Sequence, residues 1–451
     1  MTVTEEFAKF IVNQDYNRLP AEVVEKVRMC VFHALACTFA GHHQQVGDVA
    51  RTYLKGLGLK GKATTILDGL KGPAAEVALV NSVIGQSTAQ EDIHGDSSAH
   101  SGTMVIPTSL ALGEEIGCSG KEFIVSVVVG YETLVRIGMS MFSPDFSRRF
   151  RPSGIFGPYG TCAAASKLLK LKEVEIVNAL GMAGNLSAGL NQWALDGSTE
   201  ICFQNGFATR NGMTSARLGK AGILAARSIV DGFIGAWSVY GKQEAASRIT
   251  ADLGTNYEIM RVYYKPAPAC AYAQSAASLA LKMVQTNEIN PNDIARIEIR
   301  TFKVAKEYPG LDYAGPFKDI AQAKMSQQFS VAAVVAFKEL SQSNYDRFTD
   351  PLVNRIASVS TLETDDTLTG SYPQKQGCSI KVVLQDKRVI TASQDDLKVF
   401  DRNQVIANFE AQGNRTLGAK QTEKLKKAIL DLENLKQINE LTALFVKPGK
   451  Q

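Results

Sequence analysis

The chain has 451 residues, which is too long for one hydrophobic core, since single cores stop growing at roughly 250 to 300 residues. Apolar residues make up 45% and charged residues 21%, a globular balance that excludes an intrinsically disordered chain. The 49 basic and 45 acidic residues leave a net charge of +4, too little to favour nucleic acid or a membrane surface as a partner.

Neither an exported nor a membrane-spanning protein is indicated by the sequence. The N-terminal twenty residues carry acidic side chains where a secretory signal needs a basic start and an apolar run. The most apolar windows, residues 123–131 and 331–337, are well short of the roughly 20 residues that span a bilayer. Seven scattered cysteines without a C-x-x-C pair indicate free thiols. We therefore expect a soluble, cytoplasmic protein.

Helices are expected from the N-terminus to about residue 258. Apolar residues recur there at spacings of three and four, as in residues 23–36, which is the helical period. Two segments, residues 160–169 and 179–190, are rich in Ala and Gly, so their backbones can approach neighbouring helices closely. We interpret these small-residue segments as core helices.

Near residue 259 the pattern changes to strands mixed with helices. Residues 293–302 alternate apolar and charged side chains, as a half-buried strand does. Residues 379–393 predict a hairpin that turns at residues 385–387. Helices are expected between these strands, over residues 273–284 and 329–339.

After about residue 395 the charged helical pattern returns, over residues 423–433 and 435–445. The sequence therefore predicts a mainly α chain with an inserted α/β part. A large all-helical domain would consist of residues 1–258 and 395–451, and a smaller α/β domain of residues 259–394.

The densest polar cluster is EDIHGDSSAH at residues 91–100. His94, Asp96 and His100 could be metal ligands, but their spacing matches no common zinc pattern and the run lacks cysteine, so we expect no metal site. Imidazole titrates near neutrality, so a general acid or base role is favoured, with Asp92 in the same set. The alternative is a solvated loop that caps the following helix.

A second candidate segment is FSRRFRPSGIFGPYG at residues 146–160. Its arginines, with Arg149 and Arg151 among them, precede a Pro- and Gly-rich turn and a small-residue helix. Guanidinium groups match carboxylates bidentately, and helix N-termini favour anions. The segment indicates a substrate with several carboxylates, with an exposed basic loop as the alternative.

The third candidate segment is YYKPAPACAYAQ at residues 263–274, near the expected domain junction. Lys265 precedes a stretch stiffened by two prolines, so its ammonium can be held in place. A buried lysine can act as a base or stabilise an enolate. Tyr272 and Gln274 are candidates for substrate binding, and a purely structural lysine is the alternative.

Together these segments resemble the MmgE/PrpD superfamily, which includes 2-methylcitrate dehydratases, cis-aconitate decarboxylases and iminodisuccinate epimerase. The similar runs are GYETLVRIG (130–138), RPSGIFGPYGTCAAASKLLKL (151–171), NALGMAGNLSAGL (178–190), KPAPAC (265–270) and AKMSQQFSVAAVVA (323–336).

The resemblance implies a helical domain built from both chain ends, a smaller α/β domain and an active site between them. It also implies a homodimer that needs no metal and no cofactor. Its implied site residues are His94, Asp92 and His100 in a polar loop, Tyr131 and Arg136 nearby, and Lys265 at the rim.

The chain departs from the family pattern at positions tied to chemistry. Arg151 stands where a histidine commonly precedes Pro-Thr-Gly, and Arg210, a further substrate-binding candidate, begins the segment where Lys-Pro-Leu-His is common. Ala271 and Gln274 replace an arginine and a histidine, and Glu91 replaces an aspartate. Expelling hydroxide requires a placed acid, so these changes weaken a direct copy of the dehydratase mechanism but leave α-proton abstraction plausible.

The first hypothesis is a lyase of the dehydratase or decarboxylase type acting on a small di- or tricarboxylate. His94 or His100 would take the α-proton, while Lys265 and Arg151 hold carboxylates and stabilise enolate-like charge. An epimerase of a dicarboxylate and a catalytically silent ligand-binding protein are the alternatives. A dinucleotide-dependent oxidoreductase is disfavoured, because no G-x-G-x-x-G follows a strand near the N-terminus.

Overall fold

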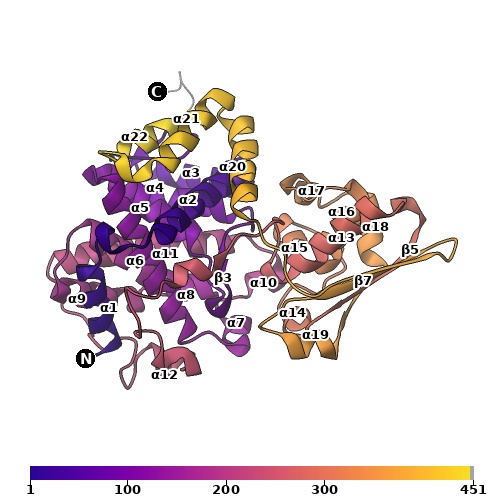
Figure 1. Cartoon of the computed structure of the whole chain (residues 1–451), viewed down its shortest axis with the longest axis horizontal. Coiled ribbons are helices and arrows are strands. Elements are labelled where there is room, and N and C mark those ends of the chain that lie inside the picture. Colours follow the sequence, from indigo (N-terminus) through magenta and orange to yellow (C-terminus); the bar gives the residue numbers. More distant parts are fainter. Residues whose placement is uncertain (447–451) are drawn as a thin grey trace.

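The computed structural model describes residues 1–446 and shows a large helical part beside a smaller part that contains a sheet (Figure 1). The helices of the C-terminal segment pack on those of the N-terminal half, so both chain ends belong to the helical part. The predicted fold class, mainly α with an α/β part, is confirmed. Among the described residues, no helix combines the length and apolarity needed to cross a membrane.

The helical part is built from the two ends of the chain. Its N-terminal helices are α1 (Val3–Asn13), α2 (Ala21–Gly41), α3 (Gln45–Gly56), α4 (Ala74–Gln86), α5 (Gly102–Ile116), α6 (Gly120–Met139), α7 (Pro144–Arg149), α8 (Pro152–Leu168), α9 (Glu173–Asn185), α10 (Trp193–Asp196), α11 (Glu200–Lys220) and α12 (Ala236–Tyr240). Its C-terminal helices are α20 (Arg402–Thr416), α21 (Ala419–Leu430) and α22 (Asn439–Thr442).

Short antiparallel strand pairs join segments of this part. They are β1 (Ala63–Thr64) with β2 (Lys71–Gly72), and β3 (Ile93–His94) with β4 (Val262–Tyr263). The second pair is the important one for function. It places the polar run at residues 91–100 beside the segment that leads to Lys265.

The α/β part contains the predicted strand and hairpin together with one strand that the sequence did not reveal. Its strands are β5 (Ile294–Thr301), β6 (Ser360–Thr364), β7 (Cys378–Leu384) and β8 (Val389–Gln394), and its helices are α13 (Gln274–Thr286), α14 (Lys303–Glu307), α15 (Ile320–Met325), α16 (Gln327–Phe337), α17 (Gln342–Asp346), α18 (Pro351–Ser358) and α19 (Asp366–Ser371).

The four strands form a mixed sheet in the order β6-β5-β7-β8. β5 pairs antiparallel with β7 and parallel with β6. Ile297 and Ile299 lie opposite Val382 and Ile380, and all four side chains are buried. In Figure 1, α13, α15, α16 and α18 lie above the sheet, and α14 and α19 lie below it.

The molecule has two apolar cores. One combines residues from α1 to α11 with residues from α20 to α22, and the other combines α13, α15, α16, α18 and the sheet. Trp193 and Ala194 of α10 belong to the second core although they precede it by about 70 residues in the chain. The domain boundaries at residues 258 and 394 stay a prediction.

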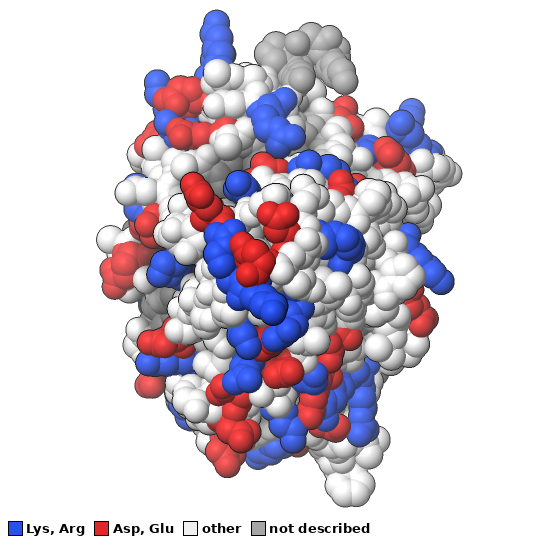
Figure 2. Space-filling view, turned by 90° about the vertical axis from the view of Figure 1, so that its right-hand side faces the viewer, with Lys and Arg blue, Asp and Glu red and all other residues white. Residues whose placement is uncertain are grey.

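On the face of the α/β part, basic and acidic side chains are mixed, and neither sign forms a large patch (Figure 2). Seen from the α/β end, Lys and Arg are interspersed with Asp and Glu (Figure 2). Ion pairs such as Arg296–Glu298 at 2.9 Å and Lys381–Glu298 at 3.2 Å lie on the sheet. The mixture on this face follows the near-neutral net charge of the sequence.

Small residues let the central helices pack closely at one of the two predicted core segments; the other, residues 179–190, leaves the helix after Asn185, and Leu190 is exposed. The predicted core segment at residues 160–169 forms the C-terminal half of α8, where all but Lys167 and Leu169 are buried. A Cβ atom on Gly212 of α11 would lie 1.9 Å from Thr161 Oγ1 and 2.6 Å from the carbonyl oxygen of Pro158. Only glycine fits where these two helices cross, because backbone atoms on α8 occupy the space.

We expect Gly212→Ala to destabilise the protein by about 1–3 kcal/mol, because the added methyl group has no room against α8. The matched control is Gly56→Ala at the end of α3, where an added Cβ meets nothing within 4 Å. The midpoint of thermal unfolding should fall for the first variant and stay or rise slightly for the second. An unchanged midpoint for Gly212→Ala would contradict the packing described.

Candidate active site

A narrow cavity of about 40 Å³ lies where the helical and α/β parts meet. The helical part contributes residues from α4, the 87–101 loop and the starts of α8, α10 and α11. The lining residues are Gln86, Ala89, Glu91, Ser98, His100, Arg151, Trp193, Ile201, Lys265, Cys270, Ala271, Tyr272, Tyr308 and Met325. Four of the predicted site residues therefore come together: His100, Arg151, Lys265 and Tyr272.

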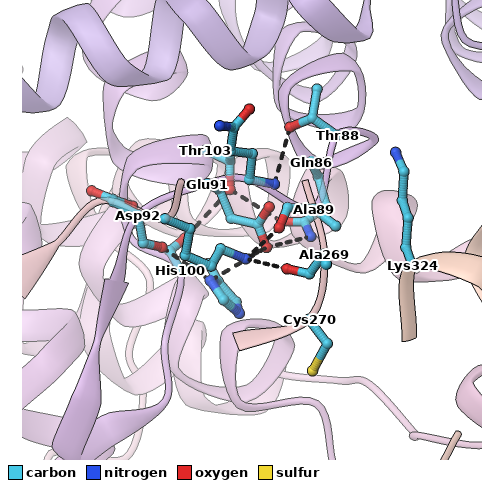
Figure 3. A network of polar contacts seen from close by, with 12 residues as sticks. Gln86, Thr88, Ala89, Glu91, Asp92, His100, Thr103, Ala269, Cys270 and Lys324 are labelled. Atoms are coloured by element: carbon cyan, nitrogen blue, oxygen red, sulfur yellow. Dashed lines mark hydrogen bonds and ion pairs between the residues drawn. The ribbon is translucent and has the colours of Figure 1, made fainter. Parts of the chain in front are cut away.

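The carboxylate of Glu91 is the centre of the polar network in this cavity (Figure 3). Its Oε1 lies 3.3 Å from Lys265 Nζ and 3.3 Å from His100 Nδ1, and it accepts a hydrogen bond of 3.0 Å from Gln86 Nε2. All of these side chains are buried. Burial alone would raise the pKa of Glu91, but Lys265, His100 and Arg151 outweigh it and lower the pKa to about 2. Glu91 is therefore ionised at neutral pH.

Lys265 holds this carboxylate in place. Besides the ion pair with Glu91, its ammonium donates to the carbonyl oxygen of Ala89 and, at 3.4 Å, to that of Ala269. An ammonium has three N–H donors, so these contacts occupy all of them. Lys265 thus joins the 87–91 loop to the segment that enters the α/β part.

The contacts of His100 define its tautomer. Nδ1 lies 2.9 Å from the carbonyl oxygen of Asp92 and donates to it, because a carbonyl can only accept. The neutral ring therefore carries its free lone pair on Nε2. Burial lowers the pKa of His100 to about 3, although Glu91 opposes this effect. His100 is a neutral imidazole at physiological pH, the state that a general base requires.

Arg151 presents an unused edge of its guanidinium. Its Nε and Nη2 are buried without a hydrogen-bond partner among residues 1–446. These two nitrogens share the edge that binds a carboxylate through two parallel hydrogen bonds. The guanidinium carbon lies 5.9 Å from the ring centroid of Trp193, and the Arg151 backbone N–H donates to Gly189 at 3.0 Å. A buried cation in this arrangement is suited to a carboxylate ligand.

Asp92 and Tyr131, both predicted as catalytic, lie behind the cavity and do not line it. The Asp92 carboxyl group accepts from Tyr131 Oη at 2.7 Å and from the backbone N–H of Gly102 at 2.8 Å. Burial raises the pKa of Asp92 to about 6. The pair holds the start of α5 and the backbone carbonyl that orients His100.

His94, the other histidine predicted as a possible base, also lies outside the cavity. Its side chain is fully buried, with Nε2 3.3 Å from Glu258 Oε2 and Nδ1 3.1 Å from Ser97 Oγ. The hydrogen bond from His94 lowers the pKa of Glu258 to about 2, with Arg261 adding to the effect. His94 connects the β3 loop to the β4 segment and does not face a substrate.

Three predicted substrate-binding residues have other contacts. Arg149 is exposed and pairs with Asp145 at 3.2 Å. Arg210, on α11, donates to Tyr53 Oη on α3 at 3.1 Å. Gln274 is fully buried and donates to backbone carbonyls of the 267–270 turn, at 2.9 Å for that of Ala267. None of the three lines the cavity.

Arg136, which the resemblance placed near the site, also serves the fold. It pairs with Glu132 at 2.9 Å and donates to three carbonyl oxygens of the 249–256 segment. No metal centre is built from the candidate ligands either: among the described residues, no three His, Cys, Asp or Glu side chains gather closely enough. Asp96, one of those candidates, pairs with Arg261 at 2.6 Å.

The sequence reasoning did not include Glu91, Cys270 or Tyr308 among its site residues. Glu91 could have been found, because an acid in the same run as His100 is a natural ion-pair partner for a histidine or a lysine. Tyr308 carries no signal, since it reaches the cavity from a loop after α14. Its hydroxyl accepts a hydrogen bond of 3.4 Å from Asn191 Nδ2, which is 117 residues away in the chain.

A buried imidazole, carboxylate, lysine and arginine around an interdomain cavity are typical of enzymes that transfer protons on small anionic molecules. Comparison with known proteins agrees with that class. The MmgE/PrpD N-terminal domain matches residues 5–249 and the MmgE/PrpD C-terminal domain matches residues 267–434. The chain belongs to the MmgE/PrpD family, which confirms the resemblance.

The chain is also similar along its whole length to curated relatives. It is 23% identical to the cis-aconitate decarboxylase-like protein oryM of Aspergillus oryzae, over 98% of this chain and 97% of that protein. It is 21% identical to cis-aconitate decarboxylase of Aspergillus terreus, over 99% and 96%, and 24% identical to that of Homo sapiens, over 99% and 95%. These distant relatives are lyases.

We expect His100 to remain neutral, with its proton on Nδ1, down to about pH 4, because its folded-state pKa is about 3. Proton–nitrogen correlation spectra of ¹⁵N-histidine-labelled protein, which has five histidines, measure this directly. In Glu91→Gln the pKa should fall further, since the carboxylate raises it. Protonation of His100 near pH 6.5, or a proton on Nε2, would contradict the assignment.

The same shift affects stability. An unfolded histidine has a pKa of about 6.5, so unfolding takes up a proton below that pH. His100 should therefore reduce the free energy of unfolding progressively as pH falls from about 6.5 towards 3. Denaturant titrations at several pH values measure this loss. In His100→Gln the free energy of unfolding should fall less between about pH 6.5 and pH 3 than in the wild type.

Proposed function

We propose that the protein is a lyase of the dehydratase or decarboxylase type that acts on a small di- or tricarboxylate by α-proton transfer at His100. The observation that carries the proposal is the pairing of two unused groups in one cavity. The Nε–Nη2 edge of Arg151 can bind a carboxylate, and the Nε2 lone pair of His100 can take a proton. The whole-length similarity to cis-aconitate decarboxylases supports the lyase class.

The charges of the cavity favour an anionic substrate. Arg151 and Lys265 are cationic, Glu91 is anionic and His100 is neutral, which leaves one net positive charge in a site shielded from water. A substrate carboxylate on Arg151 would neutralise it. Because the donors of Lys265 are already used, Arg151 is the better candidate for direct substrate contact.

The reaction would begin when His100 Nε2 removes the proton next to the bound carboxylate. The resulting enolate-like charge is stabilised by Arg151, and the imidazolium by Glu91, whose Oε1 lies 3.3 Å from Nδ1. In a dehydratase the hydroxyl group on the neighbouring carbon then takes the proton from the imidazolium and leaves as water, and a double bond forms. The decarboxylase route differs: carbon dioxide leaves without prior proton removal, the electron pair of the broken bond stays on carbon, and that carbon takes a proton from a protonated cavity residue such as Cys270 or Tyr308.

An epimerase of a dicarboxylate is the second candidate, and one observation favours it. Burial raises the pKa of Cys270 and raises that of Tyr308 to about 12, so both cavity residues stay protonated. Either could return a proton after His100 has removed one. An epimerase needs such a second proton donor, but it needs no acid to assist a leaving group.

We also propose that the protein works as a homodimer in a reducing, cytoplasmic setting. Leu224, Phe233, Ile234 and Val239, in the segment around α12, are at least 66% exposed. Monomers seldom leave such large apolar side chains together in water. The seven cysteines are free thiols, which supports a reducing compartment.

Proton NMR of the enzyme in D₂O with citrate, 2-methylcitrate, cis-aconitate and iminodisuccinate tests the reaction class. New vinyl signals or loss of carbon dioxide are expected for a lyase. Deuterium incorporation without them would instead establish an epimerase. No change with any compound in the panel would contradict both and favour a catalytically silent protein.

With an active substrate, His100→Gln should lower kcat by roughly 10²–10⁴-fold, because the proton-transfer group is lost. Arg151→Met should lower kcat/KM by roughly 10²-fold, through loss of a buried charge-assisted contact. The matched control is Arg149→Met, two residues away and exposed, which should behave as the wild type. Equal losses at both arginines would refute the role of Arg151.

A further inference from the structure

A second, larger cleft of about 410 Å³ adjoins the catalytic cavity. The two spaces share five lining residues, which are Gln86, Ala89, Trp193, Ile201 and Met325. The cleft continues between the loop before α3 and the segment that contains α15, so it also lies between the helical and α/β parts. The catalytic cavity, with about 40 Å³, has room for little more than a few atoms beyond one water. The remainder of a polycarboxylate must therefore extend into the adjoining cleft.

Lys324 of α15 lines this cleft, and its side chain is nearly inaccessible to solvent, at 4% relative exposure. Its Nζ donates to the carbonyl oxygen of Ser87 at 2.5 Å and to Gln342 Oε1 at 3.1 Å. Both acceptors are neutral. Two of the three N–H donors are used, and one is left for a ligand.

This lysine lacks a direct counter-ion. Among residues 1–446 its hydrogen bonds are to neutral oxygens, and its link to the carboxylate of Asp346 runs through Gln342, which donates to Asp346 at 3.0 Å. Burial lowers its pKa to about 8, which reflects this uncompensated position. In Figure 3 it stands apart from the Glu91 network, on the side of Gln86 and Ala89. A buried ammonium without a counter-ion is stabilised when a ligand supplies one.

We propose that Lys324 binds a second carboxylate of the substrate, remote from the reacting carbon, and so determines which acids the enzyme accepts. The proposal rests on the proposed function, since it assumes that a carboxylate on Arg151 anchors the reacting end. The substrate would then be an acid whose carboxylates span the distance from the catalytic cavity to the cleft. Lys324 acts as a specificity residue and takes no part in proton transfer.

Calorimetric titration tests this without any need for turnover. The probes are saturated α,ω-dicarboxylates from succinate to sebacate, tricarballylate, and for each dicarboxylate the monocarboxylate of equal length. In the wild type, dicarboxylates within one range of chain lengths should bind roughly tenfold or more tightly than the monocarboxylates of equal length, because their second carboxylate reaches Lys324. Lys324→Met should abolish this gain and leave the weak binding through Arg151 unchanged.

Two further variants separate binding from folding. Lys324→Arg keeps the charge and should retain part of the gain, whereas Lys318→Met removes an exposed lysine of the same cleft and should retain all of it. Thermal unfolding midpoints show whether loss of the Ser87 contact alone disrupts the fold. A gain that persists in a folded Lys324→Met protein, or no gain at any length in the wild type, would overturn the proposal.

The carboxylate subsite at Lys324 and the proposed lyase activity can fail independently of each other. A gain that depends on Lys324 without turnover of any acid would support the subsite and contradict the lyase. Turnover of a polycarboxylate with a KM that is unchanged in Lys324→Met would support the lyase and contradict the subsite. If both hold, Lys324→Met should raise KM while kcat stays within about twofold, as expected for a contact made equally in the ground and transition states.

Discussion

The ion pair between Glu91 and Lys265 is the interaction on which the site depends. It joins the polar loop of the helical part to the segment that leads into the α/β part, and both partners are at most 2% exposed. Each charge is tolerable in this position only because the other is present, since an isolated buried charge costs several kcal/mol. The same carboxylate supports His100 on its other side. The connection between the two parts and the electrostatics of the cavity therefore both depend on the Glu91 side chain.

Around this pair, several residues that look chemical act by positioning others. Asp92 binds Tyr131 and Gly102 through its carboxyl group, while its backbone carbonyl fixes the tautomer of His100. His94 ties β3 to the β4 segment through Glu258. Polar side chains this deeply buried need partners, and a fully partnered network defines a single geometry. These positioning roles explain why residues 91–100 contain so many polar side chains although only some of them line the cavity.

The sequence predicted the fold class and the general place of the site, but it could not rank residues within the site. His94 and His100 lie in one run and have the same chemistry, and their separation depends on the β3–β4 pairing, which involves two residues in each strand. Arg149 and Arg151 are likewise only two residues apart, yet Arg149 ends α7 in solvent and Arg151 is buried at the start of α8. Lys265 was identifiable because two prolines follow it. The free edge of Arg151 depends on what surrounds it in three dimensions, which no local pattern records.

The division of residues between the two parts has a consequence for the chemistry. Glu91, His100 and Arg151 all come from the helical part, and Lys265, at the start of the segment that enters the α/β part, holds the Glu91 carboxylate. The α/β part contributes Tyr308 and Met325 to the walls and Lys324 to the adjoining cleft. A small change in that part would alter the adjoining cleft without replacing His100, the proposed proton-transfer group. Under the proposed function, different parts of the chain would therefore control the reaction type and the substrate range.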